Sequence, residues 1–197
     1  MNADQVARLN FDELKAEDRE VLLLKAFRWM RAQKRLPYPV YMERVQTFPT
    51  VFVDVFTCVK GPFGWEILLD ERPANDAHFA GRHHVPGTTV MLRDSFEVAK
   101  NVTIDESVSS GAGDTLRFLG VINFPKMHRE HAVVIAYLRI LSQKPEKPAS
   151  GAFHRLAELP EPLIEHQRRT YFHLVRAALE CGERWQPIVV ELLEATE

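Results

Sequence analysis

The chain has few cysteines, no long apolar run and no excess of basic residues. Its two cysteines, Cys58 and Cys181, cannot supply the four ligands of a structural zinc site and can form at most one disulfide. Cys58 lies in an apolar run, which predicts a small core residue in a reducing, cytoplasmic protein. No apolar stretch approaches the ~20 residues that a membrane span requires. The net charge of -2 gives no positive field, so we expect neither a nucleic acid nor a membrane as partner.

The composition is that of an ordinary globular protein. The 197 residues are 46% hydrophobic and 26% charged, which is enough for one well-buried domain with additions. We expect a helical extension over residues 1–48, a main domain over residues 49–180 and a short C-terminal helix over residues 181–197.

The N-terminal extension is predicted to contain one amphipathic helix, Asp12–Arg35. Its apolar residues recur at helical spacing, and its acidic start and basic end suit the helix dipole. We expect this apolar stripe to pack on the domain that follows, and a homodimer seam is the alternative. The stripe consists of Val21, Leu24, Phe27 and Met30, with Trp29 beside them.

The main domain alternates strands with helices, which predicts a mixed sheet covered on both faces. β-Branched and aromatic residues predict strands at Val51–Val59, Trp65–Asp70, His83–Val85, Thr88–Met91, Thr115–Phe124, His131–Leu141 and Ala152–Leu156. Apolar spacing predicts helices at Phe96–Val108, Pro162–Glu180 and Pro187–Glu194. Asp54, in the first strand, faces solvent or satisfies a buried donor, and the sequence gives it no catalytic role.

The stretch from His84 to Val108 carries the most functional information. It consists of a strand, a Pro86-Gly87 turn, a loop and a helix that bears acids. Asp94 or Ser95 is suited to cap that helix, because a short polar side chain accepts a hydrogen bond from the first turn.

This stretch resembles the box of the Nudix superfamily, and the resemblance covers roughly residues 51–174. It implies an α/β/α sandwich with a mixed sheet, here with an added N-terminal helix. It also implies a magnesium ion held against a diphosphate by glutamates on one face of the box helix. The family pattern is Gly, five residues, Glu, seven residues, then Arg-Glu-apolar-any-Glu-Glu-any-Gly-apolar.

The box of this chain is degenerate. Begun at Thr88, it has Asp94 where the first Glu is expected and keeps Glu106 of the later acids. Thr103 and Ser107 replace the other two metal-facing glutamates. Begun one residue earlier, at Gly87, it pairs Asp105 with Glu106, so both registers retain Glu106.

The resemblance also implies roles for individual residues. The Gly87 carbonyl and Glu106 would hold Mg2+, which prefers oxygen ligands. Arg72, at the end of a strand, would steady a phosphate together with Arg82 and His84, and surface ion pairs are the alternative for the two arginines.

A second group of candidates precedes the strand at residue 131. Glu130 or His131 is predicted to assist a water molecule, because carboxylates and imidazoles act as general bases. The alternative is a polar, solvated loop in which His131 only begins a strand.

Two functions follow from these residues. The first is metal-dependent hydrolysis of a nucleoside diphosphate linked to another moiety, with catalysis weakened or altered by the lost acids. The second is a catalytically inactive Nudix domain that binds a nucleotide-like ligand or a protein.

Overall fold

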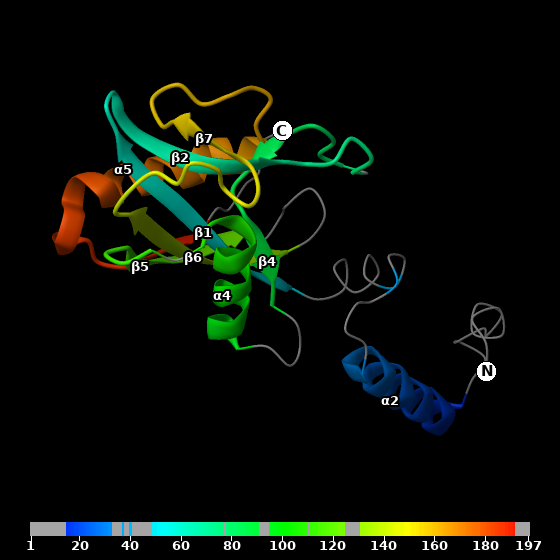
Figure 1. Cartoon of the computed structure of the whole chain (residues 1–197). Helices are drawn as coiled ribbons and strands as arrows, with labels where there is room; N and C mark the ends of the chain where they lie inside the picture. The colour runs from blue at the N-terminus through cyan, green and yellow to red at the C-terminus, as the bar shows by residue number, and fades with distance from the viewer. Residues whose placement is uncertain are drawn as a thin grey trace. The chain divides into compact units, whose positions relative to one another are not determined.

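The chain comprises two compact units, Met1–Met42 and Glu43–Glu197. The computed structural model describes residues 15–32, 37, 40, 49–76, 78–90, 95–109, 111–124 and 131–191. In the first unit, helix α2 runs from Ala16 to Ala32 (Figure 1), so the ends predicted for it lie outside the described residues. Val21, Leu24 and Trp29 are each about half exposed, and the partner of their stripe stays a prediction. None of the described helices is long and apolar enough to cross a membrane.

The second unit is built on an eight-stranded mixed sheet in the order β3-β2-β1-β6-β5-β8, with β4 paired to β1 and β7 paired to β2. The strands are β1 (Thr50–Gly61), β2 (Gly64–Glu71), β3 (His83–His84), β4 (Gly87–Thr89), β5 (Thr115–Phe124), β6 (Ala132–Leu141), β7 (Ala152–Arg155) and β8 (Ile188–Glu191). The helical segments are α4 (Phe96–Ser107), the π-helix η2 (Gln167–Tyr171), α5 (Phe172–Cys181) and the 3-10 turn η3 (Gly182–Arg184).

Alternation along β1 divides the core between the two faces of the sheet. Val53 and Val55 cluster with Ala99 and Ile104 of α4. Phe56 faces the other way and meets Tyr171 edge to face, with ring centroids 5.1 Å apart. Figure 1 shows α4 and α5 on opposite faces of the sheet, which confirms the predicted α/β/α sandwich. Each buried Val or Phe stabilises this arrangement by about 1.5–3 kcal/mol.

The pairing of β1 positions the elements of the box. β6 runs parallel to β1 along one edge, from Thr50 to Val59. The other edge is shared by β4, which pairs with Phe52–Asp54, and by β2, which pairs with Cys58–Gly61. This arrangement sets Gly87 of β4 directly opposite Asp54.

The predicted C-terminal helix Pro187–Glu194 is wrong. Residues Ile188–Glu191 form β8, which runs parallel to β5, and residues 192–197 lie outside the described part. The β-branched run Ile188-Val189-Val190 favours a strand once a partner is available. Gly120 provides that partner, because a Cβ there would lie 1.9 Å from the Ile188 carbonyl oxygen.

The helix predicted from Pro162 starts later than expected. Leu163 instead forms a bridge with His83, and the His83 amide donates to the Pro162 carbonyl at 2.8 Å. This segment satisfies backbone groups of β3 that would otherwise be unpaired. The helical part begins at Glu165 and contains the π-helix η2 before α5.

Candidate functional site

Local sequence determines the placement of helix α4. Ser95 is the N-cap, as predicted, and its hydroxyl accepts from the Val98 amide at 3.2 Å. The apolar Ala99 and Ile104 draw one side of the helix onto the sheet. Thr103 and Ser107 lie on the buried side, whereas Glu106 is exposed. The other predicted cap, Asp94, lies outside the described residues.

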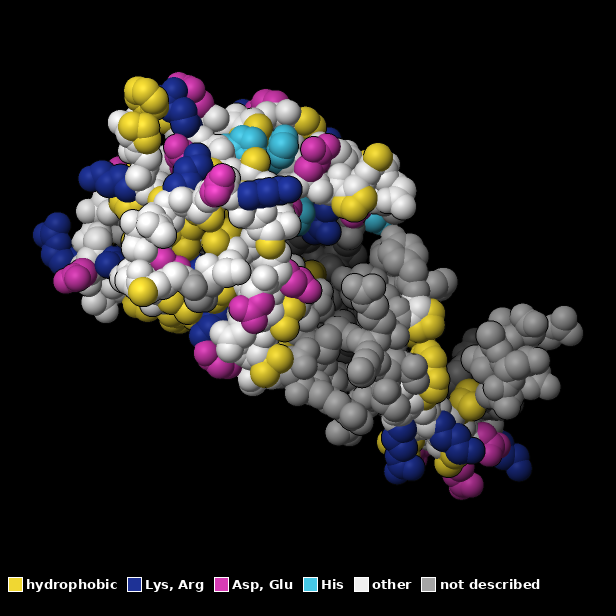
Figure 2. Space-filling model, viewed as in Figure 1, with side chains coloured by type: hydrophobic (Ala, Val, Ile, Leu, Met, Phe, Trp, Pro, Cys, Tyr) yellow, Lys and Arg dark blue, Asp and Glu magenta, His cyan; other side chains and the backbone are white. Residues whose placement is uncertain are grey.

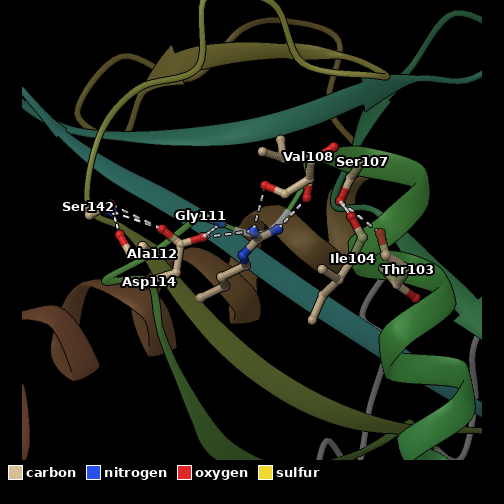
Figure 3. A network of polar contacts seen from close by, with 10 residues as sticks. Thr103, Ile104, Ser107, Val108, Gly111, Ala112, Asp114 and Ser142 are labelled. Atoms are coloured by element: carbon tan, nitrogen blue, oxygen red, sulfur yellow. Dashed lines mark hydrogen bonds and ion pairs between the residues drawn. The ribbon is translucent and has the colours of Figure 1, made fainter.

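The two hydroxyls that replace metal-facing glutamates bond within the protein. The Thr103 hydroxyl donates to the Ala99 carbonyl at 3.0 Å and lies 2.9 Å from the hydroxyl of Thr88. The Ser107 hydroxyl makes a bifurcated bond to the carbonyls of Thr103, at 2.7 Å, and Ile104, at 3.1 Å (Figure 3). Both side chains are at most 2% exposed. They therefore tie α4 to itself and to β4, in the place where the family pattern has carboxylates.

A buried arginine, Arg139, holds the backbone that follows α4 in place. Arg139 of β6 donates to the Val108 carbonyl at 2.6 Å and to the Ser109 carbonyl at 3.0 Å. Its guanidinium also pairs with Asp114 at 2.8 Å. A cation there satisfies carbonyls that a helix end leaves unpaired and complements the helix dipole.

Asp114 completes this network. Its carboxylate accepts from the amides of Gly111, at 3.0 Å, and Ser142, at 3.1 Å. Burial works to raise the pKa of Asp114, but these amide bonds and Arg139 outweigh it and hold the pKa below its ordinary value. Sequence reasoning missed both residues, although an arginine within the apolar strand β6 was a signal of a buried charge.

Replacing Arg139 tests the network. Arg139→Met leaves the Asp114 carboxylate and two carbonyls without their donor, so the free energy of unfolding should fall by about 3–5 kcal/mol. Arg155→Met, which breaks the exposed pair with Glu158, should cost less than about 1 kcal/mol. Urea unfolding measures both, and equal losses in the two variants would contradict the assigned role.

Gly87 of β4 and Asp54 of β1 lie opposite each other in the sheet. A Cβ at Gly87 would lie 1.9 Å from Asp54 Oδ1, so any other residue there would force the buried Asp54 carboxyl to move. Asp54 is 6% exposed and accepts a hydrogen bond from the Tyr171 hydroxyl. Burial raises the pKa of Asp54 to about 7, although Tyr171 and the charge of Arg72 act to lower it. The sequence alternative of a buried, hydrogen-bonded Asp54 is therefore the one that the structure adopts.

Asp54 should make stability depend on pH. Its carboxyl keeps its proton in the folded state up to about pH 7 and loses it near 3.8 when unfolded. The stability that it contributes is thus present below pH ~4 and is lost as pH rises to about 7. Asp54→Asn lacks this loss, so its stability relative to the wild type should rise across that window by up to about 4 kcal/mol, at about 1.36 kcal/mol per pK unit.

Thermal or urea unfolding at a series of pH values measures this difference. Asp105→Asn, at an exposed position of α4, is the matched control and should show no such trend. A difference between Asp54→Asn and wild type that stays constant from pH 4 to pH 8 would contradict the buried, protonated carboxyl.

Two of the three predicted substrate-binding residues line one pocket. Arg72 and His84 both lie on the wall of a cavity of about 640 Å³ at the edge of β2. Arg82 is not part of that wall, and its guanidinium donates to the Leu163 carbonyl at 3.2 Å. Figure 2 shows histidine side chains (cyan) gathered on this part of the surface.

His84 is held in one neutral form. Its Nδ1 lies 2.8 Å from the Val85 carbonyl, which can only accept, so Nδ1 carries the proton and Nε2 is an acceptor. Burial, followed by the charge of Arg72, lowers the pKa of His84 to about 4. At neutral pH the imidazole therefore contributes hydrogen bonding and no charge.

The other predicted catalytic group is only partly described. His131 Nε2 lies 2.7 Å from Asn123 Oδ1, and His131 immediately precedes β6. Glu130 lies outside the described residues. The roles assigned to both residues stay predictions.

The donor set at α4 does not fit a magnesium ion. Among the described residues, no three His, Cys, Asp or Glu side chains come together in a way that could hold a metal. Gly87 and Glu106 lie on contacting elements, β4 and α4, but Thr103 and Ser107 supply neutral hydroxyls that are already bonded. Mg2+ is ordinarily held by carboxylates and phosphates.

A mixed sheet with helices α4 and α5 on its two faces (Figure 1) defines the class of the second unit as an α/β/α sandwich. Comparison with solved structures identifies the fold more specifically. The NUDIX domain of Shewanella oneidensis NrtR, complexed with ADP ribose, is 16% identical with a TM-score of 0.55, and the match covers 73% of this chain and 99% of that domain. The C-terminal domain of mouse MUTYH, in complex with human PCNA, is 16% identical with a TM-score of 0.56, over 72% and 95% of the two chains.

A mutT/nudix family protein from Listeria innocua is 22% identical with a TM-score of 0.52, over 68% of this chain and 96% of that one. A scan of protein-family models and a search of curated proteins each found no match. The chain has the Nudix fold, as the resemblance of its sequence implies.

Proposed function

We propose that this protein is a Nudix-fold domain that binds a nucleotide-like ligand and does not hydrolyse it through a box-bound magnesium ion. The observation that carries the proposal is the pair of buried hydroxyls at Thr103 and Ser107. Each is bonded to carbonyls of α4, so two of the three positions that should carry metal-facing carboxylates are neutral and bonded within the helix, and only Glu106 keeps a charge. Diphosphate hydrolysis depends on a metal to neutralise charge and orient water, and that requirement is not met by hydroxyls.

The pocket at the edge of β2 supports ligand binding. Its volume of about 640 Å³ lies within the ~300–1,000 Å³ range of small-molecule sites. Arg72 and His84, both expected from the sequence to contact substrate, line it. The ADP ribose complex of the NrtR NUDIX domain makes ADP-ribose a suitable first probe.

One experiment should distinguish ligand binding from hydrolysis. ADP-ribose and nucleoside diphosphates, titrated with and without Mg2+, should raise the melting temperature by an amount that grows with the logarithm of ligand concentration above the dissociation constant. The stabilisation should approach about 2.7 kcal/mol at one hundred times the dissociation constant. Chromatography of the same mixtures should detect no product.

Hydrolysis is the competing function. It would use Glu106 and the Gly87 carbonyl for the metal, with Glu130 or His131 assisting water. Metal-dependent product formation that is lost in Glu106→Gln, but kept in the neighbouring control Asp105→Asn, would overturn the proposal. A failure of every nucleotide to stabilise the protein would also count against it.

A further inference from the structure

The pocket forms where two short strands meet on one edge of β2. β7 pairs with Glu66–Leu69, and β3 pairs with the next residues, Asp70 and Glu71. The ends of β3 and β7 therefore face each other across a break in the pairing. The lining includes Asp70, Glu71 and Arg72 from β2 and its end, and His83, His84 and His154 from β3 and β7. We call this the edge pocket.

The edge pocket holds unpaired polar groups. Asp70 Oδ1 and Arg72 Nε are buried and have no hydrogen-bond partner among the described residues. A buried polar atom left unpaired costs about 1–3 kcal/mol, so a ligand that pairs with it is favoured. One of these atoms accepts and the other donates. A ligand that pairs with both must carry a donor for Asp70 and an acceptor for Arg72.

The wall offers little attraction to an isolated phosphate. Asp70 and Glu71 bring two carboxylates beside the single guanidinium of Arg72. His84 is neutral at pH 7, and burial together with His83 lowers the pKa of His154. Phosphate sites usually have an excess of positive charge or a helix N-terminus. The lining of this pocket has neither of the two.

Ring faces add an apolar surface. His83 and His154 meet edge to face with centroids 5.2 Å apart, one from each of the two strand ends. Imidazole rings can pack against the C–H face of a sugar while their nitrogens bond to hydroxyls. Ser150 and Gly151, which precede β7, also line the pocket, and this segment is tied to α4 because the Ala149 and Ser150 amides approach the Ser107 carbonyl at 2.8 and 3.4 Å.

We propose that the edge pocket binds a neutral vicinal diol, the ribose of the nucleotide-like ligand, between Asp70, Arg72 and the His83–His154 pair. A small rotation of the Asp70 carboxylate lets one hydroxyl donate to it, while the neighbouring hydroxyl accepts from the Arg72 guanidinium. This inference rests on the proposed function for the identity of the ligand. It assigns the sugar, and not the phosphate, to this pocket.

The test compares adenosine with 2′,3′-dideoxyadenosine, which lacks the diol, and with inorganic phosphate. Calorimetry should give a dissociation constant at least about tenfold larger without the diol, because unmet polar groups penalise the analogue. Nuclear magnetic resonance of the histidine rings should show the His83 and His154 signals responding to adenosine and not to phosphate. Equal affinity for the two nucleosides, or a response of these rings to phosphate alone, overturns the assignment.

Variants locate the binding. Asp70→Asn should weaken ADP-ribose and adenosine at least about tenfold, whereas Glu146→Gln, at an exposed loop position, should bind as the wild type does. If Asp70→Asn fails to fold, the nucleoside comparison on the wild-type protein decides alone. ADP-ribose that binds both proteins equally, without a His154 response, overturns the pocket assignment and leaves the proposed function standing. Adenosine that binds while ADP-ribose does not would remove the proposed function instead.

Discussion

The guanidinium of Arg139 connects the sheet to the box helix, and the geometry of the candidate site depends on it. Arg139 lies in β6 and is 2% exposed, and its guanidinium donates to the carbonyls of Val108 and Ser109, directly after α4. The Asp114 carboxylate pairs with this guanidinium, and the backbone amides of Gly111 and Ser142 donate hydrogen bonds to Asp114. Because this end of α4 is held in place, the Ser107 carbonyl can accept hydrogen bonds from the Ala149 and Ser150 amides. Ser150 in turn lines the edge pocket. One buried ion pair thus orders both the helix and a pocket wall.

The burial of α4 against the sheet explains why hydroxyls replace carboxylates in the degenerate box. Thr103 and Ser107 occupy positions where carboxylates would require a metal or water to offset their burial. Hydroxyls need neither, because helix carbonyls accept from them. Asp54 illustrates the cost of the alternative, since burial raises its pKa to about 7 even though Tyr171 and Arg72 act to lower it. Thr103 and Ser107 of the box helix are therefore packed within the protein, and under the proposed function polar recognition takes place at the edge of β2.

The sequence predicted what depends on local pattern. Alternation and composition placed β5 without error and β1, β2 and β6 within two residues of their observed ends, and Ser95 marked the start of α4. The motif also singled out Arg72 and His84, which lie on one pocket wall, and their contact with a substrate stays a prediction. What it could not predict depends on distant partners. β8 is a strand because Gly120 of β5 has no Cβ and leaves room for the Ile188 backbone. Arg139 pairs with Asp114, which lies 25 residues away in the sequence.

The central claim is that α4 is closed to metal, and paramagnetic relaxation tests it most directly. Mn2+ added with ADP-ribose should broaden the amide signals of Thr103, Glu106 and Gly87 no more than those of exposed residues elsewhere in the chain. Selective broadening of these three residues at low Mn2+ concentration, relieved by excess Mg2+, would place a metal between β4 and α4 and contradict the account.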